Sequence, residues 1–479
     1  MQYPPEIAQT DKDIALTSSQ QWALAHGLCL LVEGDKPNRA QHAPFTLFPT
    51  PFPKQAFNSA LEVQTLFNQL YVSVASRPEW LESVVSELGS FDPDFTGKLL
   101  ELHLKAKKAP GPRQRLTGGV FRSDYIVNSK DQIKQVEFNA VSVSFGALSS
   151  KVSALHRYLV RSGAYGIDYP LDSIPESPSL QKITESLAKM HKAYKKSSED
   201  EEAAILVVVQ PGERNIFDQR LIEFELFEKH GIVTHRVTLG EVKQKTQLVE
   251  GNILYHNDSG AEISVVYYRS GYAPGDYVSK EEWDARLMLE CSYSIQCPSI
   301  LTQLSGAKKI QQLLTEPSVI RKVAPRLTKA EIEKLSESFV AIHPFDDESP
   351  EGRHARTLAF DHPQNYVLKP QREGGGNNIY RDNIPGFLTQ TPKSNWPAYI
   401  LMELINPPKM NNEIVRDGEI ISGEIVSELG VFGGALWDRD SGDLKFEDTC
   451  GWLLRSKMQS SDEGGVAAGF GCVDGVYLV

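Results

Sequence analysis

An uninterrupted apolar run, AAILVVV at residues 203–209, constrains the fold of this chain more than any other feature. The run is rich in β-branched residues and does not alternate with polar ones, which is typical of a strand buried on both faces of a parallel sheet. After the turn QPGERN, the segment FDQRLIEFELFEKHG predicts a helix that ends at Gly231, and IVTHRVTL and ISVVYYRS predict further strands. The order strand, helix, strand predicts a doubly wound domain over residues 203–304.

The remaining segments predict a larger body around this domain. The charged segment KKSSEDEE at 195–202 follows an amphipathic helical pattern, LQKITESLAKMHKAY, and predicts a link. NYVLKP, AYILMELI and EIVSELGVFGGALW predict strands in the C-terminal half. We therefore expect an α/β protein with five successive segments: the first part of the body (1–202), the doubly wound domain (203–304), a return to the body (305–339), a second strand-rich unit (340–420) and the last part of the body (421–479).

Composition narrows the functional classes. The formal net charge of −12 over 479 residues argues against general attraction to nucleic acid or anionic membranes. The longest apolar runs are too short to span a bilayer, and the N-terminal segment lacks the pattern of a secretory signal. The five cysteines are scattered without CxxC spacing, which is typical of reduced structural thiols. We expect a cytoplasmic protein that binds neither nucleic acid nor membrane.

The segment LKPQREGGGNNIYRDN at 368–383 contains three consecutive glycines, Gly374–Gly376. A backbone without Cβ atoms lets successive N–H groups face one anion such as phosphate, although the segment matches neither the P-loop nor the dinucleotide fingerprint. By itself the run is compatible with a flexible connector or with a phosphate cover. Its neighbours favour the phosphate cover, because Lys369 and Arg372 offer positive charge while Glu373 and the two asparagines offer oxygen ligands for Mg²⁺.

A second candidate site lies in KQVEFNAVSVSF at 134–145. On a strand, Glu137 and Asn139 share one face, and both are hard oxygen donors suited to Mg²⁺. Ser142 and Ser144 have the opposite parity, so a bulge or turn near Ala140 is required if all four face one cleft. An edge strand with a solvated polar face explains the pattern equally well.

Polar residues near predicted strand ends supply further candidates. In LLRSK, Arg455 and Lys457 share a strand face, where the guanidinium can grip a carboxylate and the ammonium a phosphate; surface charge is the alternative. The glycine-rich segment EGGVAAGFG at 463–471 either admits a small substrate or forms a mobile loop. In the doubly wound domain, Glu213 and the segment 269–272 follow strands, where ligands bind in such sheets. No Ser-His-Asp or Cys-His signature of a nucleophile is present.

Taken in order, eleven motifs closely resemble the eukaryotic glutathione synthetase family of ATP-grasp ligases: FRSDY, QVEFNAVSVSFG, ERNIFDQ, YRSGY, WDARLMLE, TQLSGAKKIQQLL, LKPQREGGGNN, YILMELI, SELGVFG, LLRSK and GGVAAGFG. The resemblance extends from about residue 45 to about residue 471. It implies a homodimer that uses ATP and Mg²⁺ to join γ-glutamylcysteine to glycine through an acyl phosphate. It also implies an ATP-grasp body with an antiparallel sheet, an inserted substrate domain with a parallel sheet, and a lid over 340–420 that carries the glycine loop.

The resemblance also implies the roles of individual residues. The ligands of two Mg²⁺ ions would be Glu137, Asn139 and Glu373. The nucleotide would be held by Lys308, Lys369, Gly374, Gly375, Gly376, Asn377, Asn378, Tyr380, Met402, Glu403, Leu404, Ile405, Glu428 and Lys457. The peptide substrate would contact Arg122, Ser142, Ser144, Glu213, Asn215, Gln219, Arg269, Tyr272, Arg455, Val466 and Ala467. The implied catalytic residues are Arg122, Arg455 and Gly375. Ala140 stands where threonine is common, and Ser270 where an acidic residue or threonine occurs, which leaves the role of Ser270 open.

Three alternatives follow from the same sequence. A sister ligase that takes β-alanine or another amine differs by as little as one methylene in the substrate. A catalytically silent ATP-binding regulator has no need of Glu137, Asn139, Glu373 and Lys457, all of which are present. A dinucleotide oxidoreductase built on the 203–304 sheet lacks its glycine fingerprint.

Overall fold

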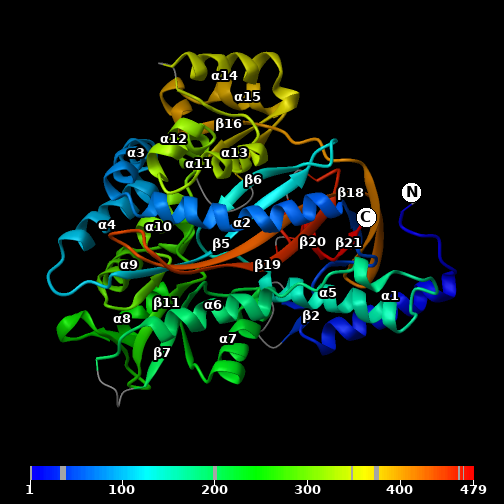
Figure 1. Cartoon of the computed structure of the whole chain (residues 1–479), viewed down its shortest axis with the longest axis horizontal. Helices are drawn as coiled ribbons and strands as arrows, with labels where there is room; N and C mark the ends of the chain where they lie inside the picture. Colours follow the sequence, from blue (N-terminus) through cyan, green and yellow to red (C-terminus); the bar gives the residue numbers. More distant parts are fainter. Residues whose placement is uncertain are drawn as a thin grey trace.

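A large mixed sheet forms the centre of the molecule. The computed structural model describes residues 3–32, 39–197, 202–346, 349–371, 377–461, 464–467 and 469–479, and Figure 1 labels many of its elements. In spatial order the sheet runs through β17 (Met410–Arg416), β3 (Phe45–Thr46), β20 (Gly471–Asp474), β19 (Leu444–Met458), β18 (Glu419–Asp438), β5 (Leu116–Val127), β12 (Ile295–Cys297), β11 (Glu262–Tyr268), β10 (Leu254–His256) and β9 (Thr246–Leu248). Off this path, β6 (Ile133–Asn139) pairs with β5, and β7 (Ala203–Val209) pairs with β11 and β8 (Thr234–Thr238).

The sheet has an antiparallel part and a parallel part. β6, β5, β18, β19 and β20 pair antiparallel, whereas β12, β11, β7 and β8 run parallel. Because β7 lies between β8 and β11, the chain reverses its direction of travel across the sheet after β8, which creates a switch point between β7 and β11. The helix α7 (Ile216–His230) joins β7 to β8 and ends at Gly231, whose φ is 68°. The predicted α/β class, with an antiparallel body and a parallel unit, is confirmed.

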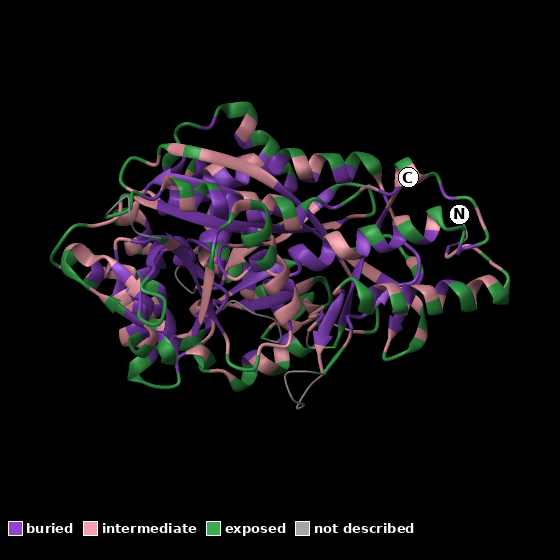
Figure 2. Ribbon diagram, turned by 90° about the horizontal axis from the view of Figure 1, so that it is seen from below, coloured by how far each residue is buried: buried purple, intermediate pink, exposed green. Residues whose placement is uncertain are grey.

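Helices cover both faces of the antiparallel part. α2 (Lys54–Ala75) packs against one face of β18, and α6 (Ser179–Ala193) and α5 (Gly146–Arg161) lie on the other side. The close approach explains two consecutive glycines of β18, since a Cβ on Gly433 would lie 2.0 Å from Asn68 of α2 and one on Gly434 would lie 2.4 Å from Ser186 of α6. Figure 2 shows the resulting buried strands enclosed by helices with exposed outer sides.

Further helices surround these layers, and two small strand pairs join distant segments. The helices are α1 (Gln9–Ala25), α3 (Pro78–Phe91), α4 (Lys98–Lys108), α8 (Val242–Lys245), α9 (Lys280–Cys291), α10 (Ile300–Ser305), α11 (Lys308–Leu314), α12 (Pro317–Val323) and α13 (Lys329–Ser338). The strand pairs are β1 (Cys29–Leu31) with β2 (Ala40–His42), and β4 (Thr50–Phe52) with β21 (Val476–Leu478). Within the described ranges, no helix is long and apolar enough to cross a membrane.

A smaller sheet stands apart, at the top of Figure 1. Its strands, in spatial order, are β13 (Ile342–Pro344), β16 (Tyr399–Glu403), β14 (Tyr366–Pro370) and β15 (Ile379–Tyr380). Together with α14 (Pro350–Asp361) and α15 (Asn383–Gln390) it has a hydrophobic core of its own. β17 falls within the predicted unit 340–420 but pairs with β3 and β18, so it belongs to the large sheet. The division of the chain at 202, 304, 339 and 420 stays a prediction.

Candidate active site

The two sheets meet at a cluster of charges in which Lys308 and Lys369 are buried and Glu137 is half-buried. Glu137 of β6 accepts a hydrogen bond at 2.9 Å from Lys308, the first residue of α11. Lys369 of β14, in the small sheet, donates to the carbonyl oxygen of Val136 at 3.1 Å. α11 contacts β6 as well as β13 and β16 of the small sheet. The predicted residues Glu137, Lys308 and Lys369 therefore come together, although they are far apart in the sequence.

The surroundings of these groups change their ionisation. Burial raises the pKa of Glu137, but the charges of Lys308 and Lys369 outweigh it and hold the pKa well below its usual range. Burial lowers the pKa of Lys369 to about 8, against the attraction of Glu137. Glu137 is therefore a carboxylate at neutral pH, and the cluster has the opposite charges that a metal–phosphate site requires.

A second group of charges lies on β5, β18 and β19. Arg122 donates to both carboxylate oxygens of Asp124, at 2.6 and 2.8 Å. Asp124 also accepts from Asn139 at 2.9 Å and from Arg455 at 3.2 Å. Arg455 in turn pairs with Glu428. Burial raises the pKa of Glu428, opposed by Arg455, and the carboxylates of Glu428 and Asp124 raise the pKa of Arg455 despite its burial.

Beyond β6 the chain turns and presents two serines to the parallel part of the sheet. Ser142 has a φ of 53°, and its hydroxyl donates to the carbonyl of Tyr268 at 3.3 Å. The hydroxyl of Ser144 accepts from Arg269 at 2.7 Å, and its carbonyl oxygen accepts from Arg122 at 3.2 Å. Ser144 thus joins the charges on β5 to those beyond β11. On a continuous strand the two serines would face away from Glu137 and Asn139, and the turn after β6 removes this constraint.

Polar residues gather at the carboxyl ends of β7 and β11, on either side of the switch point. Glu213 accepts from the backbone N–H of Asn215 at 2.7 Å and from the amide of Gln219 at 2.9 Å. The Oδ1 atom of Asn215 is buried without a hydrogen-bond partner among the described residues. The hydroxyl of Tyr272 accepts from Gln210 at 3.2 Å. The loop after β19 reaches this region, because Arg214 donates to the carbonyl of Ala467 at 3.0 Å.

The other predicted nucleotide residues lie around the small sheet and at the end of β19. Asn378 donates to the hydroxyl of Tyr380 at 3.1 Å, and Lys457 donates to the carbonyl of Ser461 at 2.6 Å. Met402 and Glu403 end β16, and the N–H of Leu404 donates to Asn365 at 2.8 Å. Asn377 is exposed, Ile405 is half-buried and Val466 is buried. The predicted residues Glu373, Gly374, Gly375 and Gly376 lie outside the described residues.

Two carboxylates that sequence reasoning missed hold this arrangement together. Asp124 lies two residues from Arg122 on the same strand, and this spacing in FRSDY was a signal of a pair on one face. Asp218 is buried and accepts from the backbone N–H groups of Phe145, Ala147 and Leu148, which fixes the start of α5 beside Ser144. Burial raises the pKa of Asp218, opposed by Arg269.

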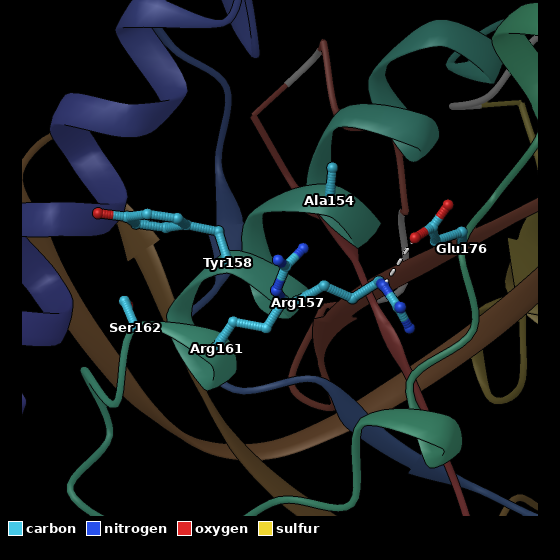
Figure 3. A pocket seen from close by; sticks show the side chains of 6 residues that line it. All are labelled: Ala154, Arg157, Tyr158, Arg161, Ser162 and Glu176. Carbon is cyan, nitrogen blue, oxygen red and sulfur yellow. Dashed lines mark ion pairs between the residues drawn. The ribbon is translucent and has the colours of Figure 1, made fainter.

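A surface hollow of about 490 Å³ lies elsewhere, on the outside of α5. It is lined by Ala154, Arg157, Tyr158, Arg161, Ser162 and Glu176, none of them a predicted site residue. In Figure 3, Arg157 reaches Glu176, at 2.9 Å, while Tyr158 points away toward α1. Because its charges are already paired or exposed, this hollow lacks the buried cations of the site between the sheets.

Comparisons with known proteins identify the family of the chain. The family model of the eukaryotic glutathione synthase ATP-binding domain matches residues 9–478. The chain is 36% identical to the glutathione synthetase large chain of Schizosaccharomyces pombe (99% of this chain, 98% of the relative), 37% identical to the glutathione synthetase of Dictyostelium discoideum (95% and 97%) and 36% identical to that of Homo sapiens (95% and 95%).

Among solved structures, a glutathione synthetase-like effector from Globodera pallida, in its apo form, has a TM-score of 0.76 and 23% identity over 99% of this chain and 98% of its own. At this identity the likeness concerns the fold alone. The sequence relatives carry the assignment to a family, since their similarity extends over nearly the whole chain. The chain therefore belongs to the eukaryotic glutathione synthetase family, as the resemblance of its motifs predicted.

Proposed function

We propose that this protein is an ATP-dependent ligase that joins the cysteinyl carboxylate of γ-glutamylcysteine to the amino group of glycine, giving glutathione, ADP and phosphate. One observation carries the proposal: Lys308, Lys369, Arg122 and Arg455 converge, largely buried, around Glu137 and Asn139 in a chain of this family. Lys308 and the two arginines pair with the carboxylates of Glu137, Asp124 and Glu428, and a phosphate group bound among these cations would also be stabilised by their positive charge.

The chemistry requires activation of a carboxylate. A carboxylate acylates amines poorly because its leaving group would be an oxide, so the terminal phosphoryl group of ATP first forms an acyl phosphate with it. The glycine amine then attacks the acyl carbon, and phosphate leaves. Lys308, Lys369 and Arg455 would hold the transferring phosphoryl group and the carboxylate in line and stabilise their charge, which is the main catalytic contribution in phosphoryl transfer. No protein nucleophile is needed.

The residues present fit a magnesium ion. The Oδ1 atom of Asn139 accepts no hydrogen bond from the described residues, because the amide nitrogen makes both contacts, to Asp124 and to the carbonyl of Arg122. Glu137 lies on the same strand face and is ionised. Both would offer oxygen ligands, and the predicted third ligand is Glu373. When bound, Mg²⁺ would supply positive charge that reduces the repulsion between the triphosphate and the dipeptide.

The dipeptide would lie across the carboxyl ends of β7 and β11. Arg269 and Arg122, joined through Ser144, would bind carboxylate groups, and the buried Oδ1 atom of Asn215 offers an acceptor to a substrate N–H group. Arg214 holds the backbone at Ala467, so Val466 and Ala467 would border the glycine subsite. In this position Val466 and Ala467 would limit the size of the amine that the subsite accepts.

Two further properties are proposed from the resemblance. We infer that the protein is a homodimer and that it acts in the cytoplasm. Support for a dimer comes from α7, where Phe224 and Phe227 lie one turn apart with exposed fractions of 48% and 61%. Sedimentation velocity at micromolar concentration tests the dimer, and a single monomeric species contradicts it. Fractionation of cells that express the tagged protein tests the location.

The central experiment measures ADP release from ATP, Mg²⁺ and γ-glutamylcysteine with glycine, with β-alanine or without an amine. Release that depends on glycine supports the proposal, and a preference for β-alanine indicates the sister ligase. If neither amine supports release while the nucleotide still binds, the protein is a silent ATP-binding homologue. Omission of Mg²⁺ is expected to abolish the reaction, and activity that persists in EDTA contradicts the metal assignment.

A further inference from the structure

Asp124 stands at the centre of the site, yet none of the roles described above belongs to it. Its side chain has no exposed surface. Its two oxygens accept from Arg122 at 2.6 and 2.8 Å, from Asn139 at 2.9 Å and from Arg455 at 3.2 Å. Each of these partners is a residue for which a role in binding metal or substrate is proposed. One carboxylate therefore connects the proposed metal ligand to both arginines.

The backbone around Asp124 is shaped to admit this carboxylate. Gly430 of β18 lies opposite Asp124 in the strand register. A Cβ atom on Gly430 would lie 2.8 Å from an oxygen of Asp124 and 2.8 Å from the side chain of Arg122. Since these distances are too short for real contacts, any other residue at 430 would displace the pair. The space above Asp124 exists because residue 430 has no side chain.

The contact with Asn139 determines which end of the amide faces the cation. An amide has one oxygen and one nitrogen, and an oxygen turned toward the carboxylate of Asp124 would be repelled. The nitrogen is therefore the end that faces Asp124, where it also contacts the carbonyl of Arg122 at 3.3 Å. The oxygen is turned outward, on the face that it shares with Glu137. An outer partner of this kind is what orients a metal ligand.

The contact with Arg455 acts on the substrate side in the same way. Asp124 and Glu428 both accept a hydrogen bond from the Nη2 atom of Arg455. The Nε and Nη1 atoms make no hydrogen bond within the described part of the chain, so they remain available to an incoming carboxylate or phosphoryl oxygen. A guanidinium is planar, and fixing one nitrogen between two carboxylates limits the directions in which the other nitrogens can point.

We propose that Asp124 is a positioning residue, which turns the oxygen of Asn139 toward the metal and holds the guanidinium of Arg455 toward the substrate without touching either ligand. The proposal rests on the proposed function for the roles of Asn139 and Arg455. It goes beyond a structural ion pair, because a carboxylate needed only for stability would leave cation affinity unchanged when it is replaced in a folded protein.

The test uses the full-length protein with a non-hydrolysable ATP analogue and measures Mg²⁺ binding by isothermal titration calorimetry. In the isosteric variant Asp124→Asn, the dissociation constant for Mg²⁺ is expected to rise by about 10–100-fold, the usual effect of losing an outer partner of a ligand. Thermal unfolding of each variant without ligands reports whether it is folded. A folded variant with wild-type Mg²⁺ affinity overturns the proposal.

A double-mutant cycle shows whether Asp124 acts through Asn139. Asn139→Ala removes the proposed metal contact itself, so Asp124→Asn added to it should weaken Mg²⁺ binding no further. If the two losses multiply, Asp124 does not act through Asn139 and the proposal is overturned. Glu290→Gln is the matched control, because Glu290 also pairs with a buried arginine, Arg286, at 3.6 Å and belongs to none of the proposed subsites. It should lower stability and leave Mg²⁺ affinity unchanged.

If Asp124→Asn does not fold, two glycine variants with smaller structural effects test the same proposal. Gly430→Ala places a methyl group against Asp124 and Arg122 and should weaken Mg²⁺ binding in the same direction. Gly423→Ala is its control on the same strand, since its methyl group would meet only the end of the flexible Met458 side chain. Equal Mg²⁺ affinity in the two glycine variants overturns the proposal.

The outcome for Asp124 is separate from the outcome for the proposed function. Calorimetry with the analogue requires no ligation, so the position of Asn139 is tested even if glycine supports no ADP release. Conversely, if the wild-type protein releases ADP with glycine while all variants keep its Mg²⁺ affinity, the proposed function stands and the role of Asp124 fails.

Discussion

At the scale of single residues, Asp474 shows how burial makes a carboxyl group sensitive to pH. Asp474 has no exposed surface and accepts hydrogen bonds from the hydroxyl groups of Thr46, Thr50 and Ser456. Burial raises the pKa of this carboxyl to about 6, although the hydroxyl groups oppose the rise. The folded state therefore favours the protonated form, and the stability that this gives is complete below about pH 4 and is lost as the pH rises through about 6.

Replacement of Asp474 by asparagine should remove this pH dependence. The free energy of unfolding of the wild type, relative to Asp474→Asn, is expected to fall by about 3 kcal/mol between about pH 4 and pH 7, because a shift of one pKa unit corresponds to about 1.4 kcal/mol. Urea unfolding followed by tryptophan fluorescence measures it. Parallel pH profiles for the two proteins contradict the prediction.

A suitable control is Asp443→Asn. The carboxylate of Asp443 is exposed, and hydrogen bonds from Ser441 and Arg326 lower its pKa. Asp443 therefore stabilises the folded state above the pKa of the unfolded chain, and this stabilisation is lost as the pH falls. The free energy of unfolding of the wild type, relative to Asp443→Asn, should rise with pH, whereas relative to Asp474→Asn it should fall.

At the scale of elements, glycines have opposite effects according to their backbone conformation. Gly231 ends α7 with a φ of 68°, and its N–H group donates to the carbonyl of Phe227 at 2.9 Å. Gly386 lies inside α15, and a Cβ atom there would meet nothing within 4 Å. Gly231 has a left-handed conformation that is unfavourable for residues with a Cβ atom. At Gly386 the glycine only destabilises the helix, because it loses more backbone entropy on folding than alanine.

The two positions form a matched pair of substitutions. Gly231→Ala should destabilise the protein by about 1 kcal/mol, and Gly386→Ala should stabilise its helix by about 0.5–1 kcal/mol. Thermal unfolding and amide hydrogen exchange in α7 and α15 measure the two effects. A change of the same sign at both positions contradicts the conformational explanation.

At the scale of the whole molecule, the two sheets have separate hydrophobic cores and meet at the site. The core of the smaller sheet contains Leu368, Leu388 and Leu401, while those of the large sheet lie on its two faces. Lys369 reaches from the smaller sheet to the backbone of β6, and Lys308 reaches Glu137 from α11. The cations of the site are therefore supplied by elements that border two cores, and their spacing depends on how the cores are positioned.

Leu388→Ala should lower the stability of the core of the smaller sheet and leave that of the large sheet unchanged. Leu388 is 1% exposed, and truncation of a buried leucine costs about 2–5 kcal/mol. Amide hydrogen exchange is expected to accelerate across 342–403 and to remain unchanged in β5, β18 and β19. Val431→Ala, in the core of the large sheet, should give the reverse distribution. Equal acceleration in both sheets after either substitution would show that the two cores unfold as one unit.

The local elements were largely predictable because their signals lie within short windows. The apolar run of β7, the periodicity of α6 and the glycine after α7 all correspond to elements of the structure. The assignment of β17 was less accurate, because NNEIVR gives no sign of which sheet it joins, and β3, its partner, lies more than 360 residues earlier. Pairing between distant strands depends on the whole fold.

Periodicity in short windows was enough to predict the main helices and strands, and the motifs were enough to recognise the family and to name candidate site residues by resemblance. Which charges become partners depends on how distant segments pack in the fold. Glu137 and Lys308 are 171 positions apart, and Asp124 and Arg455 are 331 apart. The role of Asp124 emerges at this level, because a carboxylate on a strand is an ordinary surface group until three donors close around it and exclude water.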